Sequence, residues 1–366
     1  MTDYSDTHTT SAAAAAAAGT AQAQLDQSPR SPIPVEDSDR PIEVDDLQPG
    51  DGDSVYDDDF STFTASLTSS VLNYPIEHGR RYHAFRAGIY CLPNDELEQE
   101  RLDLTHAVMT KSLGDRLFLC PIDISKMQRV LDIGTGTGIW AIAMGDEYPH
   151  AQILGNDLSA IQPPWVPPNV KFEIDDVECP WVYEAPFDFI FCRYMATSIA
   201  DWPKLVSNAY DNLAPGGWAE FQDFDLQYYS EDGSLKPESY TYQWITTLLD
   251  AARQTGRDPC PGPKLEGYLR DAGFINVEHR RIRWPIGPWP RDPHLKEVGM
   301  YNWHQIMQGL EAFSLRLYCQ VLGWKEEEVM VLLGHVRNEL RNPGLHAQFD
   351  FHVSYGQKKP SSKGKN

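Results

Sequence analysis

Three glycines stand at alternate positions directly after a short apolar run, and this pattern constrains the fold more than any other part of the chain. The run is Arg129–Ile133, the glycines are Gly134, Gly136 and Gly138, and an apolar segment that can begin a helix follows from position 139. A buried strand that turns through glycines into a helix is how open α/β sheets present a nucleotide-sized ligand at their carboxyl edge. Glycine is required there because a Cβ atom would block both the tight turn and the approach of a ligand to the backbone.

The spacing of these glycines separates two classes of cofactor. The dinucleotide fingerprint G-x-G-x-x-G would place its third glycine at position 139, which is Ile139 here. The stretch from Asp132 to Gly138 reads D-x-G-x-G-x-G instead, and this pattern resembles motif I of the class I S-adenosylmethionine methyltransferases. A nicotinamide-dependent oxidoreductase is therefore the less favoured interpretation of the same strand and turn.

Acidic residues stand where the next two apolar runs end. Asp157 closes the second run, 19 positions after Gly138, which is close to the offset of roughly 20 residues at which a carboxylate meets a ribose diol. Asp175 and Asp176 close the third run, and Arg193 follows the fourth. One carboxylate can accept hydrogen bonds from both ribose hydroxyls, and we expect Asp157 to do so from an exposed strand end.

Apolar runs alternate with helical patterns over much of the chain, which predicts an α/β fold with a mostly parallel sheet covered on both faces. A helix is expected to begin at Asp95, with Glu98 as its capping-box partner, and to form an N-terminal helical lid. The segment of about 285–345 has helical patterns before the last strand, so we expect a helical insertion that roofs the ligand crevice. The expected strands are 130–133, 151–155, 170–174, 187–192, 218–223, about 274–284 and 348–355.

The first seventy residues differ in composition from the rest of the 366-residue chain. They contain seven consecutive alanines, Ala12–Ala18, and scattered Ser, Thr and Pro residues. Residues 1–60 hold 14 acidic and two basic residues, a net charge of −12, out of −22 for the whole chain. Such a segment has too little apolar surface to offset the entropy lost on ordering. We therefore predict a disordered acidic leader over 1–70 and one catalytic domain over 71–366.

Charge and cysteine content argue against several other classes of protein. Net acidity speaks against a nucleic-acid partner, since proteins that bind nucleic acids present basic faces. No apolar stretch is long enough to span a membrane, and Asp3 and Asp6 stand where a signal peptide needs positive charge. The six cysteines include no C-x-x-C pair, which predicts reduced thiols, no metal site and a cytoplasmic or nuclear location.

Six blocks of sequence carry a narrower resemblance. They are Gly79–His106, Asp132–Gly138, Asn156–Ser159, Asp175–Glu178, Pro215–Trp218 and Phe351–Lys358. Together they resemble the LaeA-like (TAM-domain) methyltransferases of filamentous fungi over about residues 70–360. The glycine motif is shared by all class I enzymes, whereas the pattern of Tyr82–Arg86 and Leu92–Asp95 is much narrower and carries the resemblance to this family.

The resemblance implies a seven-stranded class I fold, S-adenosylmethionine as cofactor and a role in secondary metabolism. It places the loop glycines against the methionine and ribose, Asp157 on the ribose diol and Asp176 near the adenine. Arg86, with Tyr82 and Tyr90, is expected to close over the carboxylate of the cofactor. The full set of expected cofactor-binding residues is Asp132, Gly134, Thr135, Gly136, Gly138, Asp157, Leu158, Asp176, Val177, Arg193, Tyr82, Arg86 and Tyr90.

Methyl transfer is an in-line displacement in which charge is lost, so the site needs alignment and exclusion of water more than an oxyanion hole. The sequence identifies no catalytic base. His304, Glu220 and Asp223 are candidates, and a structural role is favoured for each. Members of the family include biosynthetic enzymes and regulators that act with velvet-type nuclear partners. We favour an enzyme with a small-molecule acceptor, and the regulator is the alternative.

Overall fold

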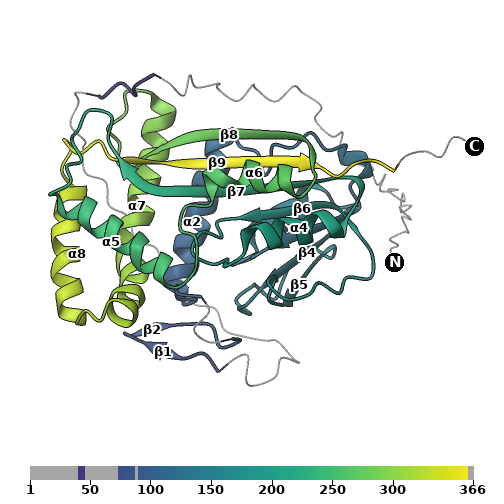
Figure 1. Cartoon of the computed structure of the whole chain (residues 1–366), viewed down its shortest axis with the longest axis horizontal. Helices are drawn as coiled ribbons and strands as arrows, with labels where there is room; N and C mark the ends of the chain where they lie inside the picture. The colour runs from purple at the N-terminus through teal and green to yellow at the C-terminus, as the bar shows by residue number, and fades with distance from the viewer. Residues whose placement is uncertain (1–39, 46–72, 87–89, 362–366) are drawn as a thin grey trace, which may run out of the picture. The chain divides into compact units, whose positions relative to one another are not determined.

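A seven-stranded sheet forms the centre of the structure, which is a computed structural model that describes residues 40–45, 73–86 and 90–361 (Figure 1). The strand order is β5-β4-β3-β6-β7-β9-β8. The first five strands in this order pair in parallel, and β9 pairs antiparallel with β7 and β8. The predicted mostly parallel α/β sheet is confirmed. The strands are β3 (Arg129–Ile133), β4 (Gln152–Asp157), β5 (Val170–Ile174), β6 (Phe187–Arg193), β7 (Leu213–Tyr229), β8 (Ile275–Pro285) and β9 (Gln348–Gln357).

Strand β7 differs most from its expected bounds, since it has 17 residues and the sequence predicted only 218–223. Its length follows from having a partner on each side. It pairs with β6 through Leu213 and with β9 as far as Tyr229. The sequence shows a strand-like apolar pattern only in the middle of β7. The outer residues are held in the sheet by backbone pairing with β6 and β9, which leaves no such pattern.

Successive side chains on the parallel strands face opposite sides of the sheet and belong to two separate cores. On β6, Phe189 and Phe191 belong to one core, whereas Ile190 and Cys192 belong to the other. The first core includes buried residues of α2, α3, α5, α7 and α8, and the second includes those of α4 and α6. Figure 1 shows α4 and α6 on the opposite side of the sheet from α2. The helices are α2 (Glu96–Ser112), α3 (Ile139–Glu147), α4 (Trp202–Asn212), α5 (Tyr240–Gln254), α6 (Leu265–Asp271), α7 (Pro293–Arg316) and α8 (Glu326–Leu340).

The helical insertion before the last strand is present. Between β8 and β9 the chain forms α7, a π-helical turn at Leu317–Val321 and α8. The Asp292 side chain caps α7 by accepting from the backbone N–H of Leu295. Helix α5, which precedes β8 in the chain, joins this insertion: the Tyr318 hydroxyl donates to the Trp244 carbonyl at 2.8 Å. Three helices from two parts of the sequence, α5, α7 and α8, therefore pack together. We call them the helical roof, and that they cover a ligand stays a prediction.

A short hairpin, β1 (Ile76–Glu77) and β2 (Arg80–Arg81), precedes the first long helix, α2. Asp95 caps this helix as predicted, because its carboxylate accepts from the N–H of Glu98 at 3.1 Å. The expected capping box is wrong in its second half. The Glu98 carboxylate is buried and binds the guanidinium of Arg101 at 2.6 Å instead.

Six residues of the predicted leader, 40–45, lie against the domain, whereas 1–39 and 46–70 lie outside the described residues. Ile42 is 9% exposed and packs with Trp289 and Leu295. Val44 forms an antiparallel bridge with Pro290, in which the Asp45 N–H donates to the Trp289 carbonyl at 2.8 Å. Lys296 pairs with the Asp45 carboxylate. An apolar anchor and backbone pairing thus attach part of the acidic leader, and its predicted boundaries stay a prediction.

We expect Ile42→Ala to release this segment without unfolding the domain. Loss of a buried isoleucine side chain costs about 1–3 kcal/mol, which would speed exchange of the Asp45 and Arg291 amide protons by roughly five- to a hundredfold. Hydrogen exchange resolved by residue measures this. Val44→Ala is the matched control, since Val44 is 36% exposed. Equal protection in Ile42→Ala and the wild type would contradict the anchoring role.

Candidate functional site

The glycine loop follows β3 and runs into α3. Gly134, Gly136 and Gly138 have φ angles of +65°, +58° and +81°, in the left-handed region that a side chain strains. A Cβ atom on Gly134 would overlap the Met195 side chain, and one on Gly138 would overlap the ring of Phe172. At Gly136 the nearest protein atom to such a Cβ would be a Leu102 methyl carbon at 3.8 Å, an ordinary contact distance, so a Cβ here would overlap no protein atom.

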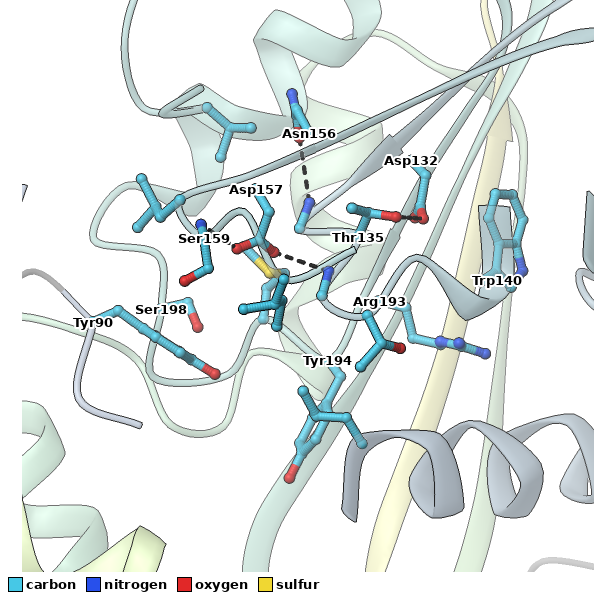
Figure 2. Close-up of a pocket in the computed structure, with 18 of the residues that line it drawn as sticks. Tyr90, Asp132, Thr135, Trp140, Asn156, Asp157, Ser159, Arg193, Tyr194 and Ser198 are labelled. Atoms are coloured by element: carbon cyan, nitrogen blue, oxygen red, sulfur yellow. Dashed lines mark hydrogen bonds between the residues drawn. The ribbon is translucent and has the colours of Figure 1, made fainter. Parts of the chain in front are cut away.

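The end of β4 holds the loop in place. The Asp157 carboxylate accepts from the N–H of Gly136 at 2.9 Å through one oxygen and from the N–H of Ser159 at 2.9 Å through the other (Figure 2). The Asn156 side chain accepts from the N–H of Gly134 at 3.3 Å. Asp157 was expected at an exposed strand end, and this was wrong: it is half-buried and shapes the loop. Its replacement would therefore alter the loop as well as any ligand contact.

A pocket opens over this loop at the carboxyl ends of β3, β4, β5 and β6 (Figure 2). Ten of the thirteen expected residues line it. They are Asp132, Gly134, Thr135, Gly136, Asp157, Leu158, Asp176, Val177, Arg193 and Tyr90. Gly138 does not line it, and its role is to let the loop pack against Phe172. Tyr82 and Arg86 are also not part of the lining.

Charged groups are concentrated on the floor of the pocket. Burial raises the pKa of Asp132 to about 7, although the Thr135 hydroxyl donates to its carboxylate at 2.6 Å. Burial likewise raises the pKa of Asp157 to about 6. Burial lowers the pKa of Arg193 to about 10 and that of His106 to about 3, so that Arg193 is a cation and His106 is neutral at pH 7. The two contact each other at 2.7 Å.

Comparison with known proteins decides the family. A family model described as a methyltransferase domain matches residues 91–279, which include the whole glycine loop and the ends of β4, β5 and β6. This is more than half of the 366 residues. The chain belongs to the methyltransferase family. The sheet order and the glycine loop identify it as a class I methyltransferase.

Three relatives from filamentous fungi match most of the chain. Methyltransferase pytC of Aspergillus terreus is 49% identical over 301 residues, which cover 82% of this chain and 93% of the relative. The secondary metabolism regulator LAE1 of Cochliobolus heterostrophus is 37% identical, over 78% of this chain and 97% of the relative. The probable methyltransferase tdiE of Emericella nidulans is 35% identical, over 82% and 93%. The expected resemblance to LaeA-like methyltransferases is confirmed.

S-adenosylmethionine is the methyl donor of this class of methyltransferase, and the pocket fits it in three respects. The space over Gly136 leaves room for a ligand beside the backbone. The Asp157 oxygens each have a second lone pair for a ligand hydroxyl. The Arg193 Nη1 atom is buried without a hydrogen-bond partner among the described residues, and Arg193 lines the pocket. Such an atom requires an acceptor, and a carboxylate suits it.

The lid expected from Tyr82, Arg86 and Tyr90 has a different geometry. Tyr82 is fully buried, and the guanidinium of Arg316 lies over its ring. Arg86 forms an ion pair with Asp176 at 2.6 Å, at the end of β5. Only Tyr90 lines the pocket. Arg86 thus lies at the end expected for the adenine, rather than at the end expected for the carboxylate.

Helix α2 supplies a wall of the pocket that sequence reasoning did not assign to the cofactor. Leu102, Thr105, His106 and Met109 line it from this helix. The recurrence of these positions at intervals of three and four residues was the available signal. Further lining residues from loops, which no periodic pattern marks, are Asn94, Ser159, Tyr194, Met195 and Ser198.

The three candidate bases do not line the cofactor pocket. Glu220 is fully buried and accepts from the N–H groups of Leu119 and Cys120 at 2.7 Å. Asp223 accepts from the N–H groups of Met195 and Ala196. His304 is exposed on α7. Across the described ranges no group of three or more His, Cys, Asp or Glu side chains could hold a metal, and no helix could cross a membrane.

We expect the affinity for S-adenosylmethionine to rise with pH between 5 and 8. The sulfonium and ammonium groups favour ionised Asp157 and Asp132, whose pKa values are raised to about 6 and about 7. Protonation of these carboxyls as the pH falls removes that attraction. Calorimetry measures the dissociation constant, and S-adenosylhomocysteine, which lacks the sulfonium charge, should show a smaller change. Equal affinity at pH 5 and pH 8 would contradict this electrostatic account.

Proposed function

We propose that this methyltransferase transfers a methyl group from S-adenosylmethionine to a small-molecule acceptor in fungal secondary metabolism. The observation that carries the proposal is the pocket at the strand ends, where an open glycine loop, the Asp157 carboxylate and the Arg193 cation lie together. The relatives named methyltransferase pytC and probable methyltransferase tdiE support the reaction, and that named secondary metabolism regulator LAE1 supports the setting.

The cofactor is assigned to four strand ends in this proposal, those of β3, β4, β5 and β6. Its methionine lies over Gly134 and Gly136 with its carboxylate on Arg193, in place of the contact with Arg86 that the sequence suggested. The ribose hydroxyls donate to Asp157. The adenine lies beside Asp176 and Val177, which follow β5 and both line the pocket.

The residues of the chain contribute alignment and exclusion of water. When bound, S-adenosylmethionine supplies an electrophilic methyl group on its sulfonium. The loop fixes the cofactor from below, and Tyr90, Thr105 and Tyr194 line the pocket beside it. Holding two reactants in line accounts for much of the rate of such a displacement, and a water-poor surrounding prevents side reactions.

A regulatory role is the second candidate, because the regulator LAE1 is 37% identical to this chain. In that case the same fold would act on gene expression together with a velvet-type nuclear partner. A cytoplasmic or nuclear location is part of both proposals.

We expect deletion of the gene to distinguish the two candidates. If the protein is an enzyme of one pathway, the deletion should change a single family of metabolites. Mass spectrometry should then find each member of that family lighter by one CH₂ unit. A regulator would lower the transcripts of several unrelated pathways. In either case the purified chain should bind S-adenosylhomocysteine and not NAD, and binding of NAD alone would contradict the assigned cofactor.

A further inference from the structure

A second cavity lies directly beside the cofactor pocket, between the sheet and the helical roof. It is enclosed mostly by apolar side chains from β7, β9, α5 and α7 and from the loops before α2 and after β6. Its lining is Cys91, Leu92, Thr105, Tyr194, Ala196, Thr197, Phe224, Leu226, Tyr228, Trp244, Ile245, Leu248, Gln305, Ile306, Phe313, Leu317 and Phe349.

The two cavities have common walls. Thr105 and Tyr194 line both of them. In the segment Tyr90–Pro93, the two end residues line the cofactor pocket and the two middle residues line the second cavity. In the segment Met195–Ser198, likewise, the two end residues line the cofactor pocket and the two middle residues line the second cavity. Two thin strips of chain thus separate the cavities, so a molecule in the second cavity lies next to the cofactor.

Aromatic rings form much of the wall. Tyr228 stacks on Phe349 with centroids 5.3 Å apart, and Phe224 meets Phe349 edge-on at 5.4 Å. Tyr194 meets Phe224 edge-on at 5.3 Å and Trp244 meets Tyr228 at 6.1 Å. Such walls favour a flat ring, since stacked and edge-to-face pairs of rings gain about 0.5–1.5 kcal/mol beyond burial.

None of the residues that line the second cavity is a Lys, Arg, His, Asp or Glu. Of the charged residues beside this cavity, Arg101 binds the Glu98 carboxylate at 2.6 Å, with both side chains 1% exposed, and the Asp223 carboxylate accepts from the N–H of Ala196. Arg101 also donates to the Tyr194 hydroxyl at 3.2 Å and to the side-chain amide oxygen of Gln305 at 3.0 Å. Because its oxygen accepts from Arg101, the Tyr194 hydroxyl can turn its own proton toward a carbonyl or hydroxyl oxygen in the cavity.

We propose that this cavity is the acceptor site and that it selects a neutral, ring-containing small molecule, which the Tyr194 hydroxyl and Gln305 orient toward the cofactor. A charged acceptor would pass from water into this cavity without a counter-ion. That transfer costs far more free energy than the transfer of a neutral ring. This inference rests on the proposed methyl transfer and names the class of its acceptor. Amines that are cations at neutral pH, phosphorylated molecules and peptide side chains with charges are excluded from this class.

The test uses the full chain saturated with S-adenosylhomocysteine and three probes of similar shape at pH 7. These are the neutral 2-naphthol, the anion 2-naphthoate and the cation 2-naphthylmethylammonium. Calorimetry should show binding of 2-naphthol, with both charged probes weaker by about tenfold or more. A charged probe that binds as tightly as 2-naphthol would overturn the assigned class.

Two variants test the place of binding. Ile306→Phe on α7 fills the cavity, and Leu248→Phe fills it from α5, so that one remains available if the other fails to fold. Either should lower the affinity for 2-naphthol by about tenfold or more and keep that for S-adenosylhomocysteine. Met300→Phe is the control on the same helix, since Met300 is 46% exposed.

The outcomes separate this inference from the proposed function. Undiminished binding of 2-naphthol in both filled variants, or no binding of it to the wild type, would overturn the acceptor site while cofactor binding stands. A wild-type chain that does not bind S-adenosylhomocysteine would overturn both.

Discussion

The hydrogen bond from the Gly136 N–H to the Asp157 carboxylate is the contact on which the site depends. It joins the turn after β3 to the end of β4 and keeps three glycines in a conformation that other residues strain. Met195 and Phe172 occupy the space beside Gly134 and Gly138, whereas a Cβ on Gly136 would meet no protein atom closer than 3.8 Å. Gly134, Thr135 and Gly136 all line the pocket, so a ligand in it would lie against the backbone of the loop.

The sheet and the floor of the pocket could be predicted from the sequence because each has a local signal. Alternating or continuous apolar runs mark the strands, and the parallel order brings their carboxyl ends to one edge. Asp132 lies within the first run, Asp157, Asp176 and Arg193 stand at or after the ends of the next three, and all four line the pocket. The helical insertion was visible from apolar residues at helical spacing, such as those of α8.

Other features could not be predicted because they depend on contacts between distant segments. Arg86 pairs with Asp176, which stands 90 positions further along the chain. The role of α5 in the roof rests on packing against α8 and on the Tyr318 contact. Ile42 lies in an acidic segment whose composition indicates disorder, yet one isoleucine against Trp289 and Leu295 attaches it. Average composition hides a single anchor of this kind.

Binding of S-adenosylhomocysteine to Gly136→Val tests the central claim most directly. A valine Cβ at this position meets no protein atom closer than 3.8 Å, so a loss of affinity would come from the ligand or from backbone strain. Gly256→Val is the matched control, because Gly256 has a φ of +78° and no atom near its Cβ position, away from the pocket. We predict that Gly136→Val loses about a hundredfold or more in affinity, roughly 2.7 kcal/mol, while Gly256→Val keeps it. Wild-type affinity in a folded Gly136→Val chain would contradict the account.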